Sequence, residues 1–136
     1  MSPIVVDSSA ILAILRDEPE KDAFLELILA AHPRLMSAVN VQELGMVVAG
    51  QAGDERTWLP LNALLKRLEI EIVAHDAMLA RAAQAGFLRY GKGRHPARLN
   101  FADCAAYALA STNNVPLLFK GQDFAKTDIR AAGPVP

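Results

Sequence analysis

The N-terminal stretch that ends in Ser9 most constrains the fold of this chain. The consecutive residues Ile4–Val6 are β-branched and apolar, and Asp7 follows them directly. Such a run is typical of a short strand that is buried in a parallel sheet. After Ser8 and Ser9 the apolar residues take helical spacing. We therefore predict that the strand ends at the acid and that a serine caps the helix that follows.

Beyond this stretch, short apolar runs alternate with longer segments of helical periodicity. Strands are predicted at residues 4–6, 34–37, 69–73 and 115–119, and helices at 10–15, 20–31, 39–49, 55–68, 77–90 and 101–111. The alternation predicts an α/β fold of three layers, in which helices flank a short parallel sheet. With 52% hydrophobic residues, the chain is expected to form a single domain over residues 1–136, with a frayed tail from about residue 131.

Cellular location is constrained by what the sequence lacks. No basic segment precedes an apolar run at the start, so a signal peptide is not expected. No apolar stretch approaches the roughly 20 residues that a membrane span needs. Cys104 is the single cysteine, which excludes an internal disulfide and a cysteine-cluster zinc site. We expect a cytoplasmic protein, with Cys104 in the core.

Charge is distributed unevenly along the chain. Residues 1–76 hold 6 Lys or Arg against 12 Asp or Glu, whereas residues 77–136 hold 8 against 3. The segment 77–102 contains no acid but five basic residues, namely Arg81, Arg89, Lys92, Arg94 and Arg98. This asymmetry indicates either a nucleic-acid contact or an ordinary solvated basic face.

Four acids occupy positions where carboxylates are either unusual or well placed to bind a ligand. Asp7 ends the first strand, and Glu43 lies within an apolar helical segment. Asp103 lies in the first turn of a later helix that Asn100 is expected to cap, and Asp123 follows the last strand. Carboxyl ends of parallel strands meet at one edge of a sheet, where ligands bind. Carboxylates gathered there would repel one another unless a divalent cation such as Mg²⁺ or Mn²⁺ bound between them.

Each acid also has an ordinary structural interpretation. Glu43 is equally compatible with an exposed position on the polar side of its helix. Asp103 suits the first turn of any helix, and Asp123 suits a helix cap. The residues alone leave these alternatives open.

Several motifs along the whole chain resemble those of PIN-domain proteins, and within that family those of the VapC toxins. The acidic motifs are Ile-Val-Val-Asp at Asp7, Met-Ser-Ala-Val-Asn-Val-Gln-Glu at Glu43, and Leu-Asn-Phe-Ala-Asp at Asp103. The segment Pro-Leu-Leu-Phe-Lys-Gly-Gln-Asp-Phe resembles the fourth motif, and Tyr-Gly-Lys-Gly-Arg-His-Pro at residues 90–96 is similar to one VapC subgroup. Gly121 stands where many PIN domains have an acid, so Asp123 is the nearest replacement and Asp128 a weaker one.

The resemblance implies a metal-dependent endoribonuclease toxin of a type II toxin–antitoxin system, which cleaves RNA to inhibit translation and growth. It implies that Asp7, Glu43 and Asp103 hold Mg²⁺ or Mn²⁺ and that Asp123 orders the attacking water. Ser8 and Asn100 are expected to support these acids. The implied partners are RNA, a second copy of the chain in a homodimer, and a VapB-type antitoxin. The antitoxin is expected to dock on the helices at 20–31 and between residues 39 and 68.

RNA phosphates are expected to meet Arg89, Lys92, Arg94 and Arg98, with Tyr90 or His95 stacking on a base. Two other functions compete with this one. A non-catalytic PIN-like module that binds RNA or protein would tolerate loss of the fourth acid. A phosphatase of the haloacid dehalogenase type requires Asp-x-Asp after the first strand, and Ser9 occupies the second of these positions.

Overall fold

The structure, a computed structural model, describes residues 1–133 and centres on a parallel sheet of four strands. In spatial order these are β3 (Ile70–Val73), β2 (Arg34–Ser37), β1 (Ile4–Val6) and β4 (Leu117–Leu118). β1 lies between two parallel neighbours, and Val5 is paired with Leu35 on one side and Leu117 on the other. The predicted parallel α/β sheet is confirmed.

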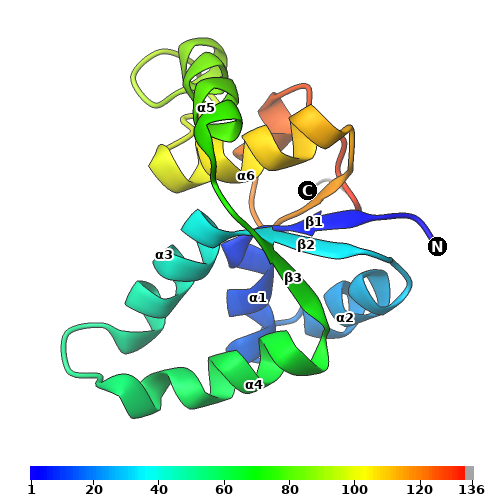
Figure 1. The fold of residues 1–136 in the computed structure, drawn as a ribbon, viewed down its shortest axis with the longest axis vertical. Helices are drawn as coiled ribbons and strands as arrows, with labels where there is room; N and C mark the ends of the chain where they lie inside the picture. Colours follow the sequence, from blue (N-terminus) through cyan, green and yellow to red (C-terminus); the bar gives the residue numbers. More distant parts are fainter. Residues whose placement is uncertain (134–136) are drawn as a thin grey trace.

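Helices cover both faces of the sheet and produce three layers (Figure 1). One side carries α1 (Ser8–Leu15), α2 (Lys21–Leu29), α3 (Ala38–Ala49) and α4 (Leu59–Arg67). The other side carries α5 (Ala77–Tyr90) and α6 (Phe101–Asn113). Two short 3₁₀ helices, η1 (Glu55–Trp58) and η2 (Phe124–Lys126), complete the elements within residues 1–133. No helix in this part of the chain is long and apolar enough to cross a membrane.

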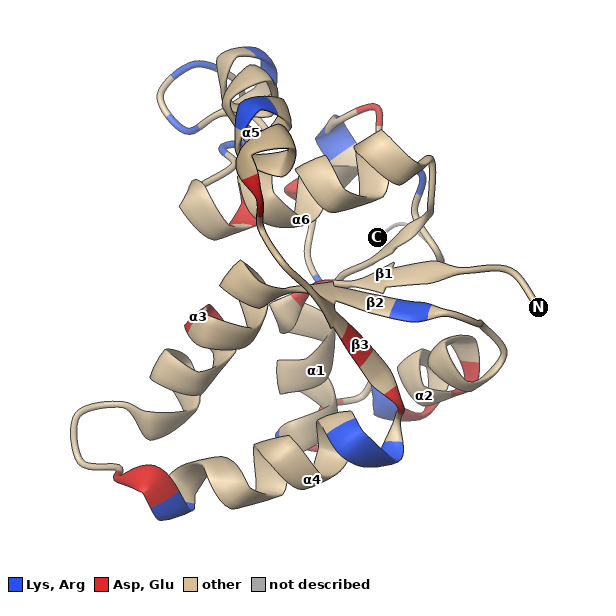
Figure 2. Cartoon of the chain, in the orientation of Figure 1, with Lys and Arg blue, Asp and Glu red and all other residues tan. Residues whose placement is uncertain are grey.

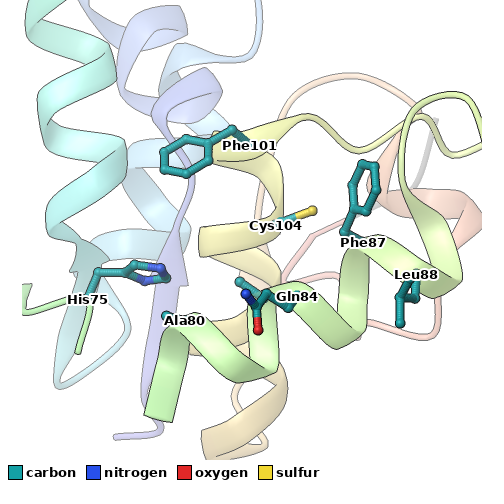
Figure 3. A pocket seen from close by; sticks show the side chains of 8 residues that line it. His75, Ala80, Gln84, Phe87, Leu88, Phe101 and Cys104 are labelled. Atoms are coloured by element: carbon teal, nitrogen blue, oxygen red, sulfur yellow. The ribbon is translucent and has the colours of Figure 1, made fainter. Parts of the chain in front are cut away.

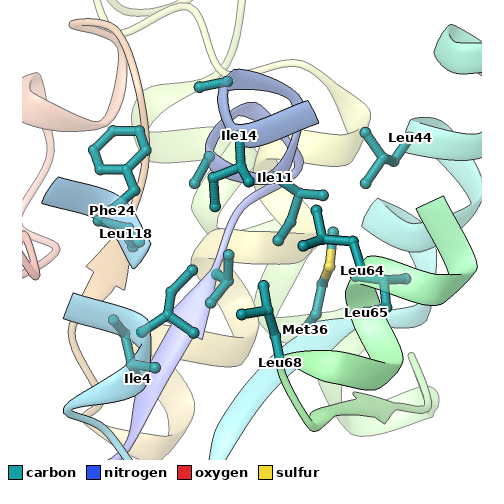
Figure 4. Close-up of a cluster of buried hydrophobic side chains, with 14 of the residues drawn as sticks. Ile4, Ile11, Ile14, Phe24, Met36, Leu44, Leu64, Leu65, Leu68 and Leu118 are labelled. Atoms are coloured by element: carbon teal, nitrogen blue, oxygen red, sulfur yellow. The ribbon is translucent and has the colours of Figure 1, made fainter. Parts of the chain in front are cut away.

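The core is divided by the sheet into two clusters. Ile4 and Val6 pack with α1, α2 and α4 in the first cluster, which Figure 4 shows around Ile11, Leu64 and other apolar side chains. Val5 points to the opposite face and joins the second cluster under α5 and α6. Successive side chains of a strand alternate between faces. A strand that is covered on both faces therefore needs an uninterrupted apolar run, which explains the sequence of β1.

The helix expected at residues 55–68 is two consecutive helices. Asp54 caps η1 by accepting a hydrogen bond from the backbone N–H of Arg56, and Thr57 completes a capping box. Pro60 lies in the first turn of α4. Proline has no N–H to donate to the preceding turn. The helical hydrogen bonds are therefore interrupted at Pro60, and η1 and α4 are separate helices.

The last strand is shorter than the predicted 115–119. Pro116 has no N–H for the sheet ladder, and after Leu118 the chain leaves β1 because the N–H of Lys120 donates to the side chain of Ser9. Beyond η2 the chain returns to the sheet, where the backbone N–H of Ala132 donates to the carbonyl of Leu117. The backbone at Ala132 is therefore still hydrogen-bonded to the sheet, although a frayed tail was expected from about residue 131. Residues 134–136 lie outside the described residues.

Candidate active site

Asp7 occupies the carboxyl end of β1 and is almost completely buried, with 3% of its surface exposed. Its Oδ2 accepts hydrogen bonds from the backbone N–H of Ser9 at 3.0 Å and from the Ser9 hydroxyl at 2.6 Å. Asp7 itself is thus the N-cap of α1, and the prediction of a serine cap was wrong. The acid performs this role because its side chain reaches the free N–H groups of the first helical turn.

Glu43 is the second acid of the site and comes from α3. It is half-buried, and its Oε1 accepts a hydrogen bond of 2.6 Å from the hydroxyl of Ser8. The carboxylate therefore turns towards the end of β1 and away from open solvent. Ser8 thus contacts one of the acids that the resemblance expects it to support.

Asp103 reaches the site from the first turn of α6. Asn100 caps this helix, since its Oδ1 accepts from the N–H of Asp103 at 2.9 Å while Asp103 Oδ2 accepts from the N–H of Asn100 at 3.0 Å. This reciprocal capping box confirms the predicted cap at Asn100. It also fixes one oxygen of Asp103, so Asn100 both starts the helix and orients the acid.

The three acids meet in one small pocket at the carboxyl edge of the sheet. The pocket has a volume of about 220 Å³ and is lined by Asp7, Ser8, Ser9, Leu12, Glu43, Leu44, Val47 and Asp103. Residues from β1, α1, α3 and α6 thus form one site, although more than ninety positions separate its first and last acids. The convergence that the sequence could only suggest is present in the fold.

Burial and neighbouring negative charges raise the pKa values of Asp7 and Asp103. Burial is the main cause of the raised pKa of Asp7, with a further contribution from the charge of Glu43 against the lowering effect of Ser9. For Asp103, burial and then the charges of Asp7, Glu43 and Asp123 raise the pKa to about 6. Like charges at close range disfavour ionisation. A cation in the pocket would remove this penalty.

The donor set fits a divalent cation in its chemistry. All three acids offer hard oxygen ligands of the kind that Mg²⁺ and Mn²⁺ prefer. Asp7 Oδ1 is buried, and no hydrogen-bond donor within residues 1–133 reaches it. Across the same residues, no group of three or more His, Cys, Asp or Glu side chains stands in the arrangement of a finished metal site. Coordination would therefore require these carboxylates to close further around the ion.

The two candidates for the fourth acid differ clearly in their surroundings. Asp123 is exposed, and its side chain caps neither η2 nor another helix, although its charge still contributes to the raised pKa of Asp103. Asp128 instead accepts a 2.6 Å hydrogen bond from the hydroxyl of Tyr107 and pairs with Arg89 at 3.4 Å. Asp128 is therefore held by contacts with Tyr107 and Arg89. Asp123 remains the candidate for the fourth acid, because its charge acts on Asp103.

The predicted RNA-binding residues lie on α5 and on the loop that follows it, where Figure 2 shows a group of basic positions. Lys92, Arg94 and Arg98 are exposed on this loop, whose ends are joined by hydrogen bonds between Tyr90, Lys92 and Leu99. Arg89 is engaged differently, because it pairs with Asp128. All three side chains are exposed to solvent, although Arg94 Nε also donates to the carbonyl of Leu88 at 3.2 Å, whereas Arg89 is tied to the protein surface by its ion pair.

Tyr90 is not available to stack on a base, contrary to the sequence-based expectation. Its ring is buried, with 9% exposed, and lies edge-on to Tyr107 and to His95 at centroid distances of 5.7 and 5.0 Å. Arg89 covers it, with its guanidinium 4.9 Å from the ring centre. The aromatic group therefore anchors the basic loop to α5 and α6.

Two polar residues near the acids were missed by sequence reasoning. Ser9 contacts Asp7 directly, as described above. Asn40 is fully buried on α3, and its side-chain amide donates a 3.0 Å hydrogen bond to the carbonyl of Ala102, beside Asp103. Its position one helical turn before Glu43 places it on the same face of α3, which is the sequence signal that would have identified it.

A wider apolar cavity of about 700 Å³ lies between α5 and the start of α6 (Figure 3). Its walls are formed by His75, Ala80, Ala83, Gln84, Phe87, Leu88, Phe101 and Cys104. Cys104 is buried as predicted, and burial together with the charge of Asp103 raises the pKa of its thiol to about 11. A thiol with such a pKa stays protonated at neutral pH, so it acts here as an apolar wall.

Comparisons with known proteins agree with this architecture. The model of the family described as PIN domain matches residues 4–130. The VapC ribonuclease Mb0640 of Mycobacterium bovis is 44% identical over 126 residues, which span 93% of this chain and 95% of that protein. A ribonuclease VapC of Mycolicibacterium smegmatis is 44% identical over 129 residues, or 94% and 98% of the two chains. The DNA-bound VapBC structure of Salmonella typhimurium has a TM-score of 0.71 at 17% identity, covering 96% and 97%.

The parallel three-layer fold with acids at its carboxyl edge is that of a PIN domain. This chain belongs to the PIN-domain family and, within it, to the group of the VapC ribonucleases. The resemblance inferred from the acidic motifs is thereby confirmed.

Proposed function

We propose that this protein is a divalent-metal-dependent endoribonuclease, the toxin of a type II toxin–antitoxin system, which cleaves RNA in the cytoplasm to inhibit translation. The observation that carries the proposal is the convergence of Asp7, Glu43 and Asp103 in one small pocket at the carboxyl edge of the sheet. The names of the relatives, which are ribonucleases, support the reaction class. The raised pKa of Asp103 and the buried Oδ1 of Asp7, which no donor among residues 1–133 reaches, support binding of a cation.

In this proposal Asp7, Glu43 and Asp103 hold Mg²⁺ or Mn²⁺. When bound, the cation lowers the pKa of an attacking water and neutralises charge on the scissile phosphate. Ser8 and Asn100 each fix one oxygen of an acid, so that the carboxylates keep their orientation. Asp123, whose charge acts on Asp103, orients the attacking water.

The basic loop after α5 provides the RNA contact. Lys92, Arg94 and Arg98 are exposed there, and the buried aromatic ring of Tyr90 holds the base of the loop in place. RNA carries its charge on the phosphates, so exposed cationic side chains attract it without regard to sequence. The acidic pocket alone would repel the strand, and the loop offsets that repulsion.

Neighbouring cavities that share lining residues lead from the helices towards the acidic pocket, and we assign them to an antitoxin. A cavity of about 640 Å³ between α1, α2 and α4 shares Leu15 and Pro60 with a second cavity of about 270 Å³. That second cavity shares Leu12 and Val47 with the acidic pocket. We name these two cavities the helical groove. It fits an amphipathic segment of a VapB-type antitoxin, with a cationic side chain at the acidic end.

A second copy of the chain is the proposed occupant of the apolar cavity between α5 and α6. Leu88 and Phe101 are 62% and 78% exposed at its edge, and its walls are apolar apart from His75 and Gln84. Phe101 also lines a neighbouring cavity with Glu43 and Val47, so this face borders the acidic pocket. Association here would cover exposed apolar surface and place the partner copy beside the active site.

The test is cleavage of total cellular RNA by antitoxin-free protein, with Mg²⁺ or Mn²⁺, with EDTA, and beside Asp7→Asn as the control. Discrete fragments that need both the cation and Asp7 are expected. Mapping their ends identifies the RNA that is cut. If folded wild-type protein binds RNA but does not cleave it with either cation, the nuclease proposal is overturned in favour of a non-catalytic binding module.

A further inference from the structure

Ser9 joins the first acid of the site to the segment that follows β4. Its hydroxyl donates to Asp7 Oδ2 at 2.6 Å, and the Ser9 Oγ accepts from the backbone N–H of Lys120 at 3.0 Å. Its own N–H donates to Asp7 Oδ2 at 3.0 Å. These contacts cross from α1 to the chain beyond β4, over 111 positions of sequence.

The contacts fix the direction of the hydroxyl proton. A serine hydroxyl has one proton to donate and lone pairs that accept. Because the N–H of Lys120 donates to Ser9 Oγ, the hydroxyl proton is directed to Asp7 Oδ2. Oδ2 thus receives two donors from Ser9, while Oδ1 is buried and unpaired among residues 1–133. Ser9 therefore determines that Oδ2 of Asp7 is the hydrogen-bonded oxygen and that Oδ1 is the oxygen left for a ligand.

Lys120 is itself firmly placed. Its Nζ pairs with Glu18 at 2.6 Å and with Glu20 at 3.3 Å, so the side chain is tied to the turn between α1 and α2. The backbone N–H of Lys120 begins the short segment that leads to Asp123. The bond to Ser9 therefore sets the start of this segment relative to Asp7. One hydroxyl connects the first acid with the segment that carries the fourth.

We propose that Ser9 is a positioning residue for the cation-dependent cleavage of RNA. It locks Oδ2 of Asp7 so that Oδ1 is presented to the cation, and it holds the Lys120–Asp123 segment against the site. The inference rests on the proposed function, because it assumes that Asp7 is a ligand of the cation. Hydrogen bonds to metal ligands generally orient them and contribute to metal affinity.

The test compares Ser9→Ala with Ser9→Thr, which keeps the hydroxyl, and with Ser2→Ala, which removes an exposed hydroxyl before the start of β1, at the opposite end of that strand from Asp7. Binding of Mn²⁺ is measured without RNA by calorimetry and by the electron paramagnetic resonance signal of free Mn²⁺. For Ser9→Ala the Kd is expected to rise about 10- to 100-fold. Ser9→Thr and Ser2→Ala are expected to stay within about threefold of wild type.

Kinetics separate positioning from a structural effect. At saturating Mn²⁺, Ser9→Ala is expected to lower kcat for an RNA substrate while leaving KM near the wild-type value, and Ser9→Thr is expected to restore kcat. If Ser9→Ala does not fold, Ser9→Cys is measured in its place, because a thiol keeps the size of the side chain but is a weak donor.

The outcomes distinguish this inference from the function on which it depends. If the wild-type protein neither binds Mn²⁺ nor cuts RNA, the proposed function itself fails. If the wild type does both and the Ser9 variant that lacks the hydroxyl matches it in Kd and kcat, only the positioning role of Ser9 is overturned.

Discussion

The side-chain amide of Asn40 donates a 3.0 Å hydrogen bond to the backbone carbonyl of Ala102, although 62 positions separate the two residues. This contact joins α3, which carries Glu43, to the first turn of α6, which carries Asp103. Asn40 is fully buried, so bulk water cannot replace this hydrogen bond if it is broken. The relative placement of two acids of the site therefore depends on a neutral side chain.

Replacement of Asn40 by alanine should destabilise the protein and loosen the site. The carbonyl of Ala102 would lose the hydrogen bond from this side chain, which costs about 0.5–1.5 kcal/mol in unfolding free energy, and the cavity left by the side chain adds to that cost. Chemical denaturation measures this loss, and Gln42→Ala on the exposed side of α3 is the matched control. Equal unfolding free energies for the two variants would contradict the role assigned to Asn40.

Stability without metal should fall as the pH rises. Folding raises the pKa of Asp103 from 3.8 to about 6, so the folded state holds this proton more tightly than the unfolded state. The resulting stabilisation is present below about pH 4 and is lost as the pH passes about 6. The pKa shift of Asp103 limits this contribution to the unfolding free energy to about 3 kcal/mol. Screening by solvent at the partly open site reduces the contribution to about 1–2 kcal/mol.

Thermal unfolding in EDTA across about pH 4 to 8 measures this dependence. Asp103→Asn removes the titrating group and should give a flatter profile, and Mn²⁺ should restore stability to the wild type above about pH 6 by binding the ionised acids. An Asp103→Asn profile as steep as that of the wild type would show that other groups cause the dependence.

The exposed cations of the basic loop should control RNA affinity. Combined substitution of Lys92, Arg94 and Arg98 by alanine removes about three phosphate contacts, which should reduce the slope of log Kobs against log salt by about 2 for single-stranded RNA. Fluorescence anisotropy in EDTA measures binding without cleavage. The double variant Lys66→Ala and Arg67→Ala, at the end of α4, is the control for loss of charge. If that control weakens binding as much as the loop variant does, the loop is not the RNA contact.

The apolar face between α5 and α6 should determine the oligomeric state. Leu88→Arg places a charge at the edge of the cavity and should convert a dimer to a monomer, as measured by light scattering during size-exclusion chromatography. Leu29→Arg is a matched control on α2, where the leucine is 52% exposed compared with 62% for Leu88. A dimer that survives Leu88→Arg would place the association of copies on another face.

The periodicity of the sequence predicted most of the fold. The apolar run of β1 and the alternation of strands and helices indicated a parallel three-layer α/β structure, because a strand that is covered on both faces must be apolar at each position. Predictions were wrong where a hydrogen bond to a single side chain decides where an element begins or ends. Asp7 caps α1 in place of a serine, and β4 ends early because the N–H of Lys120 donates to Ser9.

The sequence singled out the three acids that the fold brings into one pocket, but it did not predict the contacts around them. The motifs around Asp7, Glu43 and Asp103 mark these acids, since carboxylates are unusual in otherwise apolar segments. The burial of Tyr90 and the pairing of Arg89 with Asp128 were not predictable from spacing. Both depend on how α5 and α6 pack against the segment after β4, which no local pattern specifies.

The sequence by itself determined the identity of the acids, the order of the elements and the family, because these follow from residue type and short-range periodicity. Only the tertiary structure decided that Ser8 fixes Glu43, that Ser9 fixes Asp7 and that Asn40 joins α3 to α6. The physical reason is the short range of hydrogen bonds, which form only when donor and acceptor come within about 3 Å. Packing of the whole chain against both faces of the sheet brings these distant groups together.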